Sequence, residues 1–175
     1  MRTAQLLVGA AALTSQAAAI CFFPEPAEQI CYNVAGATPQ NLDVREVAFI
    51  AKYLRNYQTQ AVKQGLSPFW RMTEADADGC AEWQVTTKGG TWALAKLVGD
   101  DSAAVTFNDI ATTIDGGVTP TAEDVAKSLT NCGTAGGQMG VIVNTTDPLY
   151  SSAEFVDGGF TTEGIVIKLV HNPDT

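Results

Sequence analysis

The sequence has few charged residues and a single histidine, and these shortages exclude several classes of protein. Only 17% of its 175 residues are charged, while 46% are hydrophobic. That composition is too apolar for a disordered chain, and the length is typical of one domain. Acidic residues outnumber basic ones by 19 to 10, and no cluster of lysine or arginine interrupts them. We therefore expect no binding to nucleic acid, and a net charge of −9 that favours a monomer.

The chain also lacks the motifs of common catalytic machineries. Its only histidine, His171, lies near the end of the sequence and no G-x-S-x-G accompanies it, so a serine triad is not indicated. Residues 74–79 (EADADG) begin like a calcium loop, but Val85 stands where the bidentate glutamate belongs. We interpret this stretch as a solvated acidic turn. We predict no catalytic residue, no metal site and no cofactor.

Residues 1–19 (MRTAQLLVGAAALTSQAAA) have the three parts of a secretory signal peptide. Arg2 gives the positive start, an apolar stretch follows, and Ala17 and Ala19 are the small residues required before the cut. We predict cleavage between Ala19 and Ile20. No later apolar run approaches the ~18 residues of a membrane span. We therefore expect residues 20–175 to be a single domain, secreted into the extracellular space.

All four cysteines, which are Cys21, Cys31, Cys80 and Cys132, follow the predicted cut. An even number of cysteines in a secreted chain indicates disulfide bonds, here two. No close cysteine or histidine pair points to zinc. Four cysteines allow three connectivities, of which we favour Cys21–Cys31 with Cys80–Cys132.

Hydrophobic periodicity and end signals predict three helices and four strands. The helices run from Thr38-Pro39 to Gly65, from Thr106 to Gly116, and from Thr119-Pro120 onward. The strands are expected at 80–87, at 91–98 after a Gly89-Gly90 turn, near 138–145, and at 163–171. This order favours an α+β fold: an antiparallel sheet of about four strands with two to three helices packed on one face.

Two loops, 66–79 and 146–163, are rich in aromatic residues. Long loops inside compact domains often carry function, and exposed aromatic side chains in them would be binding anchors. Alternatively, both loops fold back and bury their rings. We take five residues as a candidate binding surface: Phe69, Trp70, Tyr150, Phe155 and Phe160. Asn144 is the acceptor of the only N-glycosylation sequon, Asn-Thr-Thr, and is a candidate glycan site.

Three stretches give the chain a resemblance to known proteins: AVTFNDIATTIDGG, GGQMGVIVNTTDPLY and EGIVIKLVH. They resemble small secreted proteins of filamentous fungi, most of which have no assigned function. The order of elements over residues 40–171 is similar to that of the fungal necrosis-inducing effector family and of α/β-sandwich killer toxins. The cysteine pattern departs from that of the effector family, and no functional residue carries over. The resemblance implies an extracellular fungal protein that acts on a host or a competitor.

Three functions stay open at this point. The first is a non-catalytic effector or toxin-like binding protein, whose partner is an extracellular protein or a glycan. The second is a secreted carbohydrate-active hydrolase that uses a pair of the 19 acidic residues. The third is a wall-associated structural protein.

Overall fold

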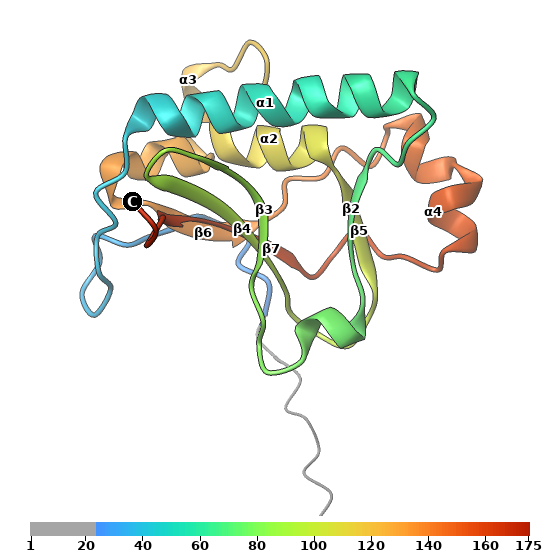
Figure 1. The fold of residues 1–175 in the computed structure, drawn as a ribbon, viewed down its shortest axis with the longest axis horizontal. Coiled ribbons are helices and arrows are strands. Elements are labelled where there is room, and N and C mark those ends of the chain that lie inside the picture. The colour runs from blue at the N-terminus through green and yellow to red at the C-terminus, as the bar shows by residue number, and fades with distance from the viewer. Residues whose placement is uncertain (1–23) are drawn as a thin grey trace, which may run out of the picture.

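The fold is α+β, as the sequence predicts, and the computed structural model describes it for residues 24–175 (Figure 1). The predicted leader, the Ala19–Ile20 cleavage site and Cys21 lie outside these residues. The main sheet is antiparallel and has five strands in the order β1-β6-β7-β4-β3. Its strands are β1 (Ile30–Cys31), β3 (Trp83–Lys88), β4 (Thr91–Leu97), β6 (Gly137–Gly140) and β7 (Ile165–His171).

A second, two-stranded sheet and several helices complete the fold. The small sheet pairs β2 (Phe69–Met72) with β5 (Ala103–Thr106) in antiparallel fashion. The α-helices are α1 (Val44–Lys63), α2 (Phe107–Asp115), α3 (Ala122–Ala126) and α4 (Ala153–Asp157). Three short 3₁₀ turns lie between these elements: η1 (Glu74–Ala77), η2 (Leu129–Ala135) and η3 (Pro148–Ser151). None of the helices in this described part is long and apolar enough to span a membrane.

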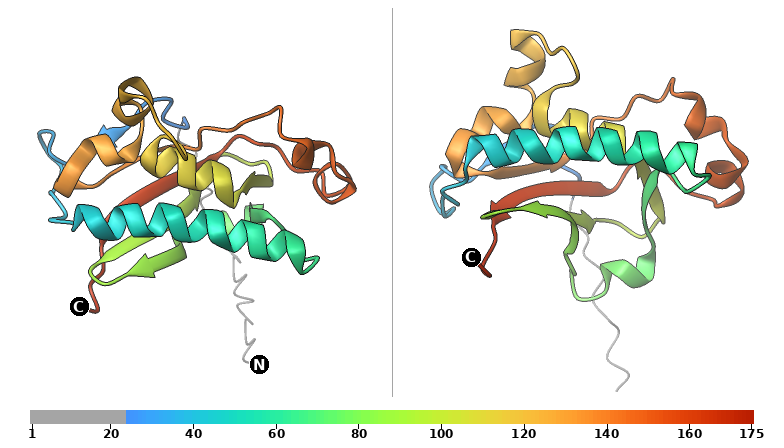
Figure 2. Two further views of the ribbon diagram at one scale, coloured as in Figure 1. Left: turned by 90° about the horizontal axis from the view of Figure 1, so that it is seen from above. Right: turned by 45° about the horizontal axis from the view of Figure 1, so that its top comes forward.

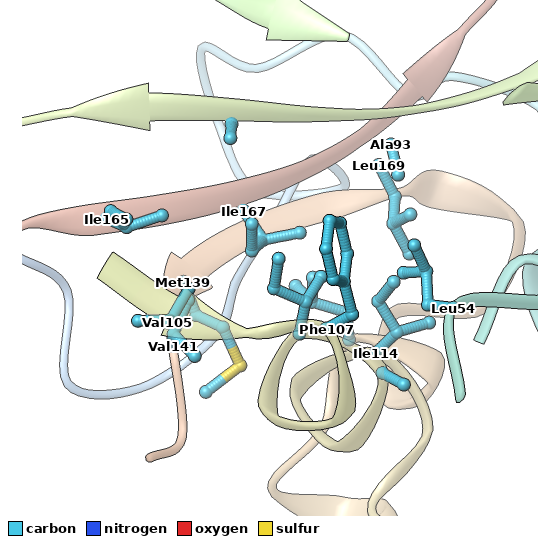
Figure 3. Packing of buried hydrophobic residues seen from close by; sticks show 14 of the residues in the cluster. Leu54, Ala93, Val105, Phe107, Ile114, Met139, Val141, Ile165, Ile167 and Leu169 are labelled. Atoms are coloured by element: carbon cyan, nitrogen blue, oxygen red, sulfur yellow. The ribbon is translucent and has the colours of Figure 1, made fainter. Parts of the chain in front are cut away.

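The core lies between the main sheet and the two longest helices. Alternate residues of β7, namely Ile165, Ile167 and Leu169, are buried in the core. The close-up in Figure 3 shows Ile167 toward Phe107 and Leu169 toward Leu54. On the neighbouring strand, Ala93 pairs with Leu169 and Ala95 pairs with Ile167. Because large side chains on β7 stand beside small ones on β4, the helices can approach the sheet closely.

Helices α1 and α2 cover the same face of the main sheet, as predicted (Figures 1 and 2). Helix α1 buries an apolar stripe of Val47, Ile50, Ala51, Leu54 and Ala61, which is what a helix lying on a core requires. A two-pronged ion pair joins the helices, with Arg55 Nη1 and Nη2 lying 2.7 and 2.5 Å from the carboxylate oxygens of Asp115.

The number of strands differs from the prediction because three strands are very short. The small sheet was not foreseen, and its strand β2 lies inside the stretch expected to be a loop. Every residue of β5 is buried, so the alternation that marks a half-exposed strand is missing. Strand β1 has only two residues and joins the sheet through pairing with β6.

The start of α1 also differs from the prediction. Its N-cap is Asp43, whose carboxylate accepts a hydrogen bond of 2.8 Å from the backbone N–H of Arg45. Thr38 is not the cap because the backbone N–H groups of Gln40 and Leu42 donate to carbonyls of η2, which keeps this segment out of the helix. The predicted ends at Gly65 and Gly116 are confirmed, since both glycines take a positive φ directly beyond a helix.

Candidate binding face

A row of three aromatic side chains lies on the outer side of α1. Phe49, Tyr53 and Tyr57 are spaced four residues apart, so they follow one another along one side of the helix. Their exposed fractions are 45%, 43% and 41%. The ring centroids of Phe49 and Tyr53 lie 6.4 Å apart, and those of Tyr53 and Tyr57 lie 6.2 Å apart. We call these residues the α1 aromatic row.

The row exists because α1 carries apolar residues beyond its buried stripe. Ile50 and Leu54 of that stripe are fully buried against the core. Tyr53 and Tyr57 lie one position before and three positions after Leu54, so they sit beside the stripe without entering the core. Surface apolar residues that are scattered singly need no explanation, whereas three large rings in contact make a continuous patch. Such patches commonly mark a surface that contacts another molecule.

The row runs into a small pocket where four elements meet. The pocket has a volume of about 160 Å³. Figure 1 shows α1 passing above β3 and β2, with the start of α2 behind them. The lining residues come from all four elements: Tyr53, Leu54 and Tyr57 from α1, Trp70 from β2, Val85 from β3, and Phe107 from α2. We call this the aromatic pocket.

The rings of the aromatic pocket are fixed by edge-to-face contacts. The ring of Phe107 lies 4.7 Å from that of Tyr57 at an interplanar angle of 73°. It lies 6.4 Å from the ring of Trp70 at 76°. Aromatic rings favour this T-shaped arrangement because the edge of one ring is positive and the face of the other is negative. The pocket wall is therefore held from beneath by Phe107, which is itself buried.

One polar atom of the pocket wall has no hydrogen-bond partner. The indole Nε1 of Trp70 is buried, and no acceptor within residues 24–175 lies in hydrogen-bond range. A buried donor without a partner costs about 1–3 kcal/mol. This atom is enclosed by the protein itself, although the Trp70 side chain lines the pocket.

The aromatic pocket and the α1 aromatic row differ in the charge around them. No charged side chain lines the aromatic pocket among the described residues. One cation lies at the far end of the row, where Lys88 Nζ sits 4.7 Å from the ring centre of Phe49. Trp83 of β3 is also exposed, and its indole N–H donates to the carbonyl oxygen of Asp76 at 2.8 Å. The pocket is therefore uncharged, whereas the row has charged neighbours on its own helix, namely Arg45, Glu46 and Lys52.

The five aromatic residues predicted from the loops do not form a shared surface. Phe69 and Tyr150 are buried in a second, smaller core, so placing them on a binding surface is wrong. Phe155 and Phe160 are half-buried against this core, with Phe155 lying 5.6 Å from Phe69 and 5.1 Å from Tyr150. The loops fold back because β2 pairs with β5 and so gives the rings a sheet to cover. Of the five, only Trp70 lines the aromatic pocket.

The α1 aromatic row was missed in the sequence, although its signal is present there. The spacing of Phe49, Tyr53 and Tyr57 is as regular as that of the buried stripe. A helix whose apolar positions extend over more than one stripe has either a wide core contact or an exposed contact surface. Periodicity alone does not distinguish the two, because both give the same spacing.

A buried polar network holds the N-terminus of α2. The hydroxyl of Tyr150 donates to Asp109 Oδ2 at 2.5 Å and accepts from the backbone N–H of Thr106 at 3.0 Å. The other oxygen of Asp109 accepts from the backbone N–H of Asn144. Burial raises the pKa of Asp109, and these hydrogen bonds only partly oppose that effect. The cluster ties three chain segments together, which gives it a structural role.

A separate depression in the surface is lined by acidic residues, and we call it the acidic depression. Its volume is about 220 Å³, and its carboxylates belong to Glu25, Asp100, Asp101 and Glu163. Glu25 Oε2 accepts from the backbone N–H of Gly164 at 2.6 Å. Burial raises the pKa of Glu25, and the nearby charge of Glu163 adds to the rise. In residues 24–175, no group of three or more His, Cys, Asp or Glu is arranged to hold a metal ion.

The remaining sequence candidates fall in ordinary surroundings. His171 is exposed at the end of β7. Asp76 of the acidic stretch accepts from the backbone N–H and the hydroxyl of Thr73, so it caps the turn η1. Asn144 is exposed, and its side-chain oxygen accepts from the backbone N–H and the hydroxyl of Thr146.

The favoured disulfide connectivity is wrong. Cys31 is bonded to Cys132, with a Cα–Cα distance of 5.1 Å. The pairing follows from the sheet, because β1 lies beside β6 and η2 leads directly into β6. Cys80 is disulfide-bonded as well. The register of two short strands, β1 and β6, thus decides the pairing.

Comparisons with known proteins give the chain no family: no family model, curated protein or solved structure matches it.

Proposed function

We propose that this chain is a secreted, non-catalytic binding protein of a fungus, of the effector or toxin-like kind, which acts outside the cell on a host or competitor. The observation that carries the proposal is the α1 aromatic row. Its three large rings are each more than 40% exposed, and the ring of Tyr53 contacts the other two. Exposed aromatic residues that cluster beside a pocket are typical energetic anchors of binding sites.

Two further observations support the extracellular part of the proposal. The Cys31–Cys132 bond is of a type that persists in oxidising compartments and is rare in the cytosol. The leader-like pattern of residues 1–19 points the same way.

The test is a binding and response assay with matched variants. The natively secreted protein is applied to host tissue and to competitor cells, and bound protein is measured on both. The double variant Tyr53→Ala/Tyr57→Ala should lose most binding. Val118→Ala truncates an apolar side chain outside α1 that is even more exposed, at 81%, and should bind as the parent does. Binding that survives loss of both tyrosines, or absent binding and response in every case, would refute the proposal.

The acidic depression supports a second candidate, a carbohydrate-active hydrolase. A buried carboxyl group with a raised pKa beside other carboxylates is a common source of a general acid. Glu25 is half-buried and its pKa is raised, and Glu163 is its acidic neighbour. The protein would be screened on glycans between pH 4 and 7 together with Glu25→Gln. Turnover that disappears in the variant would establish the hydrolase. Recovery of the inactive protein with cell walls alone would instead favour a wall-associated structural protein.

The sequon at Asn144 allows a prediction about glycosylation of the secreted protein. Its side chain is exposed, and it forms a turn with Thr146, the hydroxyl residue of the sequon. We expect the secreted protein to carry an N-linked glycan there. Intact mass before and after enzymatic deglycosylation should reveal it, and Asn144→Gln should remove it. An unchanged mass on deglycosylation of the secreted protein would contradict this prediction.

A further inference from the structure

We infer that an apolar groove on the second face of the main sheet is the docking site of residues 20–23 of the same chain, Ile-Cys-Phe-Phe. The second face is the one turned away from α1 and α2 (Figure 1). The inference goes beyond the proposed function and does not depend on it. It is carried by an apolar groove, by an anchored segment that leads out of it, and by a disulfide-bonded cysteine beside the same face.

The second face of the main sheet carries apolar side chains of its own. Neighbouring residues of a strand point to opposite faces of a sheet. Ala95 of β4 and Ile167 of β7 lie in the core against the helices. Leu94 and Val166 therefore point the other way, and they are nevertheless buried, with exposed fractions of 8% and 3%. Apolar packing thus continues on the side of the sheet that the two long helices do not cover.

A groove of about 320 Å³ lies on this face. Most of its described lining residues are apolar, namely Pro24, Pro26, Ile30, Val98 and Val166. The polar ones are Lys96 and Gln138. A lysine lays its aliphatic stem along apolar surface while its ammonium group stays in water. The groove therefore favours large apolar side chains as its occupants.

The segment that leads out of the groove is fixed to the sheet. Glu25 Oε2 accepts a hydrogen bond of 2.6 Å from the backbone N–H of Gly164. The carbonyl oxygen of Pro26 accepts one of 2.8 Å from the backbone N–H of Gly140. Pro24, which itself lines the groove, is therefore held in place by the two residues that follow it.

The residues directly before Pro24 match the groove in chemistry and in reach. Ile20, Phe22 and Phe23 are three large apolar side chains within four residues. An extended chain advances by at most ~3.6 Å per residue, so these side chains start within about 14 Å of Pro24. Leaving them in water beside an unfilled apolar groove would cost free energy on both surfaces.

Cys80 fixes the same segment from the other side. It is disulfide-bonded, and the other two described cysteines are bonded to each other, so Cys21 is the partner that remains in the chain. Two residues after Cys80, Glu82 forms an ion pair with Lys168 of β7. Lys168 follows the core residue Ile167 and so points to the second face. Cys80 therefore lies close to this face, and a disulfide holds its two Cα atoms within about 4.4–6.8 Å.

The two attachments decide between this occupant and others. Phe22 and Phe23 lie in the chain between Cys21 and Pro24, and both of these are held at the second face. Their local concentration at the groove therefore exceeds that of any free ligand. A separate partner, or the same segment of a second copy, would have to displace a segment that is covalently tied beside the groove.

The experiment is NMR spectroscopy of the secreted protein, with methyl groups and aromatic rings labelled. We expect nuclear Overhauser effects between the rings of Phe22 and Phe23 and the methyl groups of Val98 and Val166. These contacts in the parent decide the question even where a variant is not secreted. On a non-reducing gel the protein should run as a monomer.

Variants give a second readout through the apolar dye anilinonaphthalene sulfonate. Phe22→Ala/Phe23→Ala should bind the dye several-fold more than the parent does and unfold at a lower denaturant concentration, because the groove is then exposed. Phe22→Leu/Phe23→Leu keeps the apolar bulk and should stay close to the parent in both measurements. Val156→Ala truncates a side chain that is 61% exposed elsewhere, and should change neither.

Three outcomes would overturn the inference. The first is an absence of contacts between the two rings and the groove in the parent. The second is equal dye binding by the parent and the alanine variant, which would leave the groove open to a separate partner. The third is a dimer linked through Cys21 and Cys80, which would mean that a second copy supplies the segment. None of these results concerns the α1 aromatic row, so the proposed function is tested separately.

Discussion

At the scale of single residues, Tyr150 links the second core to the N-terminus of α2. Its ring packs against Phe69 and Phe155, while its hydroxyl bonds to Asp109 and to the backbone of Thr106. An aromatic residue with a polar tip can thus fill a core and fix a helix end together. The sequence shows that aromatic residues gather in the stretches 66–79 and 146–163. It does not show whether their side chains point into the core or toward solvent.

Replacing Tyr150 by phenylalanine tests this dual role. The variant keeps the ring contacts but leaves Asp109 and the Thr106 N–H without the hydroxyl. We expect the free energy of unfolding to fall by about 1–3 kcal/mol, the cost of unpaired buried polar groups. Denaturant titration measures it. Tyr57→Phe, which removes an exposed hydroxyl, serves as the control and should change little; equal losses in both variants would argue against the network.

Asp109 should make stability depend on pH in an unusual direction. Burial raises the pKa of its carboxyl group in the folded state above the ordinary 3.8. The folded state therefore holds this proton more tightly, and the associated stability is full below the unfolded pKa. It is lost as the pH rises through the raised folded pKa. Glu25, whose pKa is also raised, acts in the same direction from 4.5.

The change Asp109→Asn removes this titration. Denaturant titrations of both proteins from pH 4 to pH 8 should show the parent losing more stability with rising pH than the variant does. Asp43 and Asp124 have lowered pKa values and act in the opposite sense, but they are present in both proteins and cancel in the difference. Identical pH profiles would mean that Asp109 titrates as it does in the unfolded chain.

At the scale of elements, the end of α1 was easier to predict than its start, whereas the predicted cap of α2 at Thr106 is confirmed. A glycine beyond the last turn is nearly unambiguous, because it tolerates the positive φ that ends a helix. Thr38 and Asp43 are both acceptable caps by residue type. Contacts of Gln40 and Leu42 with η2, distant in sequence, decide between them. The short strands β1, β2 and β5 were invisible for the same reason, since their pairing partners and not their composition define them.

Two helix-ending glycines should differ in their tolerance of alanine. Gly65 and Gly116 both have positive φ, which costs a non-glycine residue about 1–2 kcal/mol. A Cβ at Gly65 meets nothing within 4 Å, whereas one at Gly116 lies 2.8 Å from the carbonyl carbon of Asp124. Gly116→Ala should therefore destabilise clearly more than Gly65→Ala. Thermal unfolding of the two variants checks the order, and equal losses would contradict the close packing of α3 against α2.

At the scale of the whole molecule, the Cys31–Cys132 bond joins segments 101 residues apart. It fixes β1 to η2 and thereby the entry of the chain into the main sheet. Chain-entropy reasoning gives a bond of this span about 4–5 kcal/mol of stability. The fold class was predictable because the long periodic segments dominate it. The connectivity was not, because it depends on pairing between strands of two and four residues.

Peptide mapping without reduction tests the connectivity. We expect one linked pair of peptides that contains Cys31 and Cys132. By subtraction, the second pair should contain Cys21 and Cys80. Cys31→Ala/Cys132→Ala should lower the free energy of unfolding by about 2–5 kcal/mol. A map with Cys21–Cys31 would contradict the pairing of β1 with β6.

The place of β7 in the sheet has a consequence for how the protein is made. This strand lies between β6 and β4, and it is the last strand of the sheet in chain order. Until the ribosome has added residues 165–171, the β3–β4 hairpin and β6 have no strand to connect them, and the helices have no completed surface to cover. The fold therefore assembles only after synthesis of the whole domain, so a chain that stops before Ile165 is a substrate for quality control and not a smaller version of the protein.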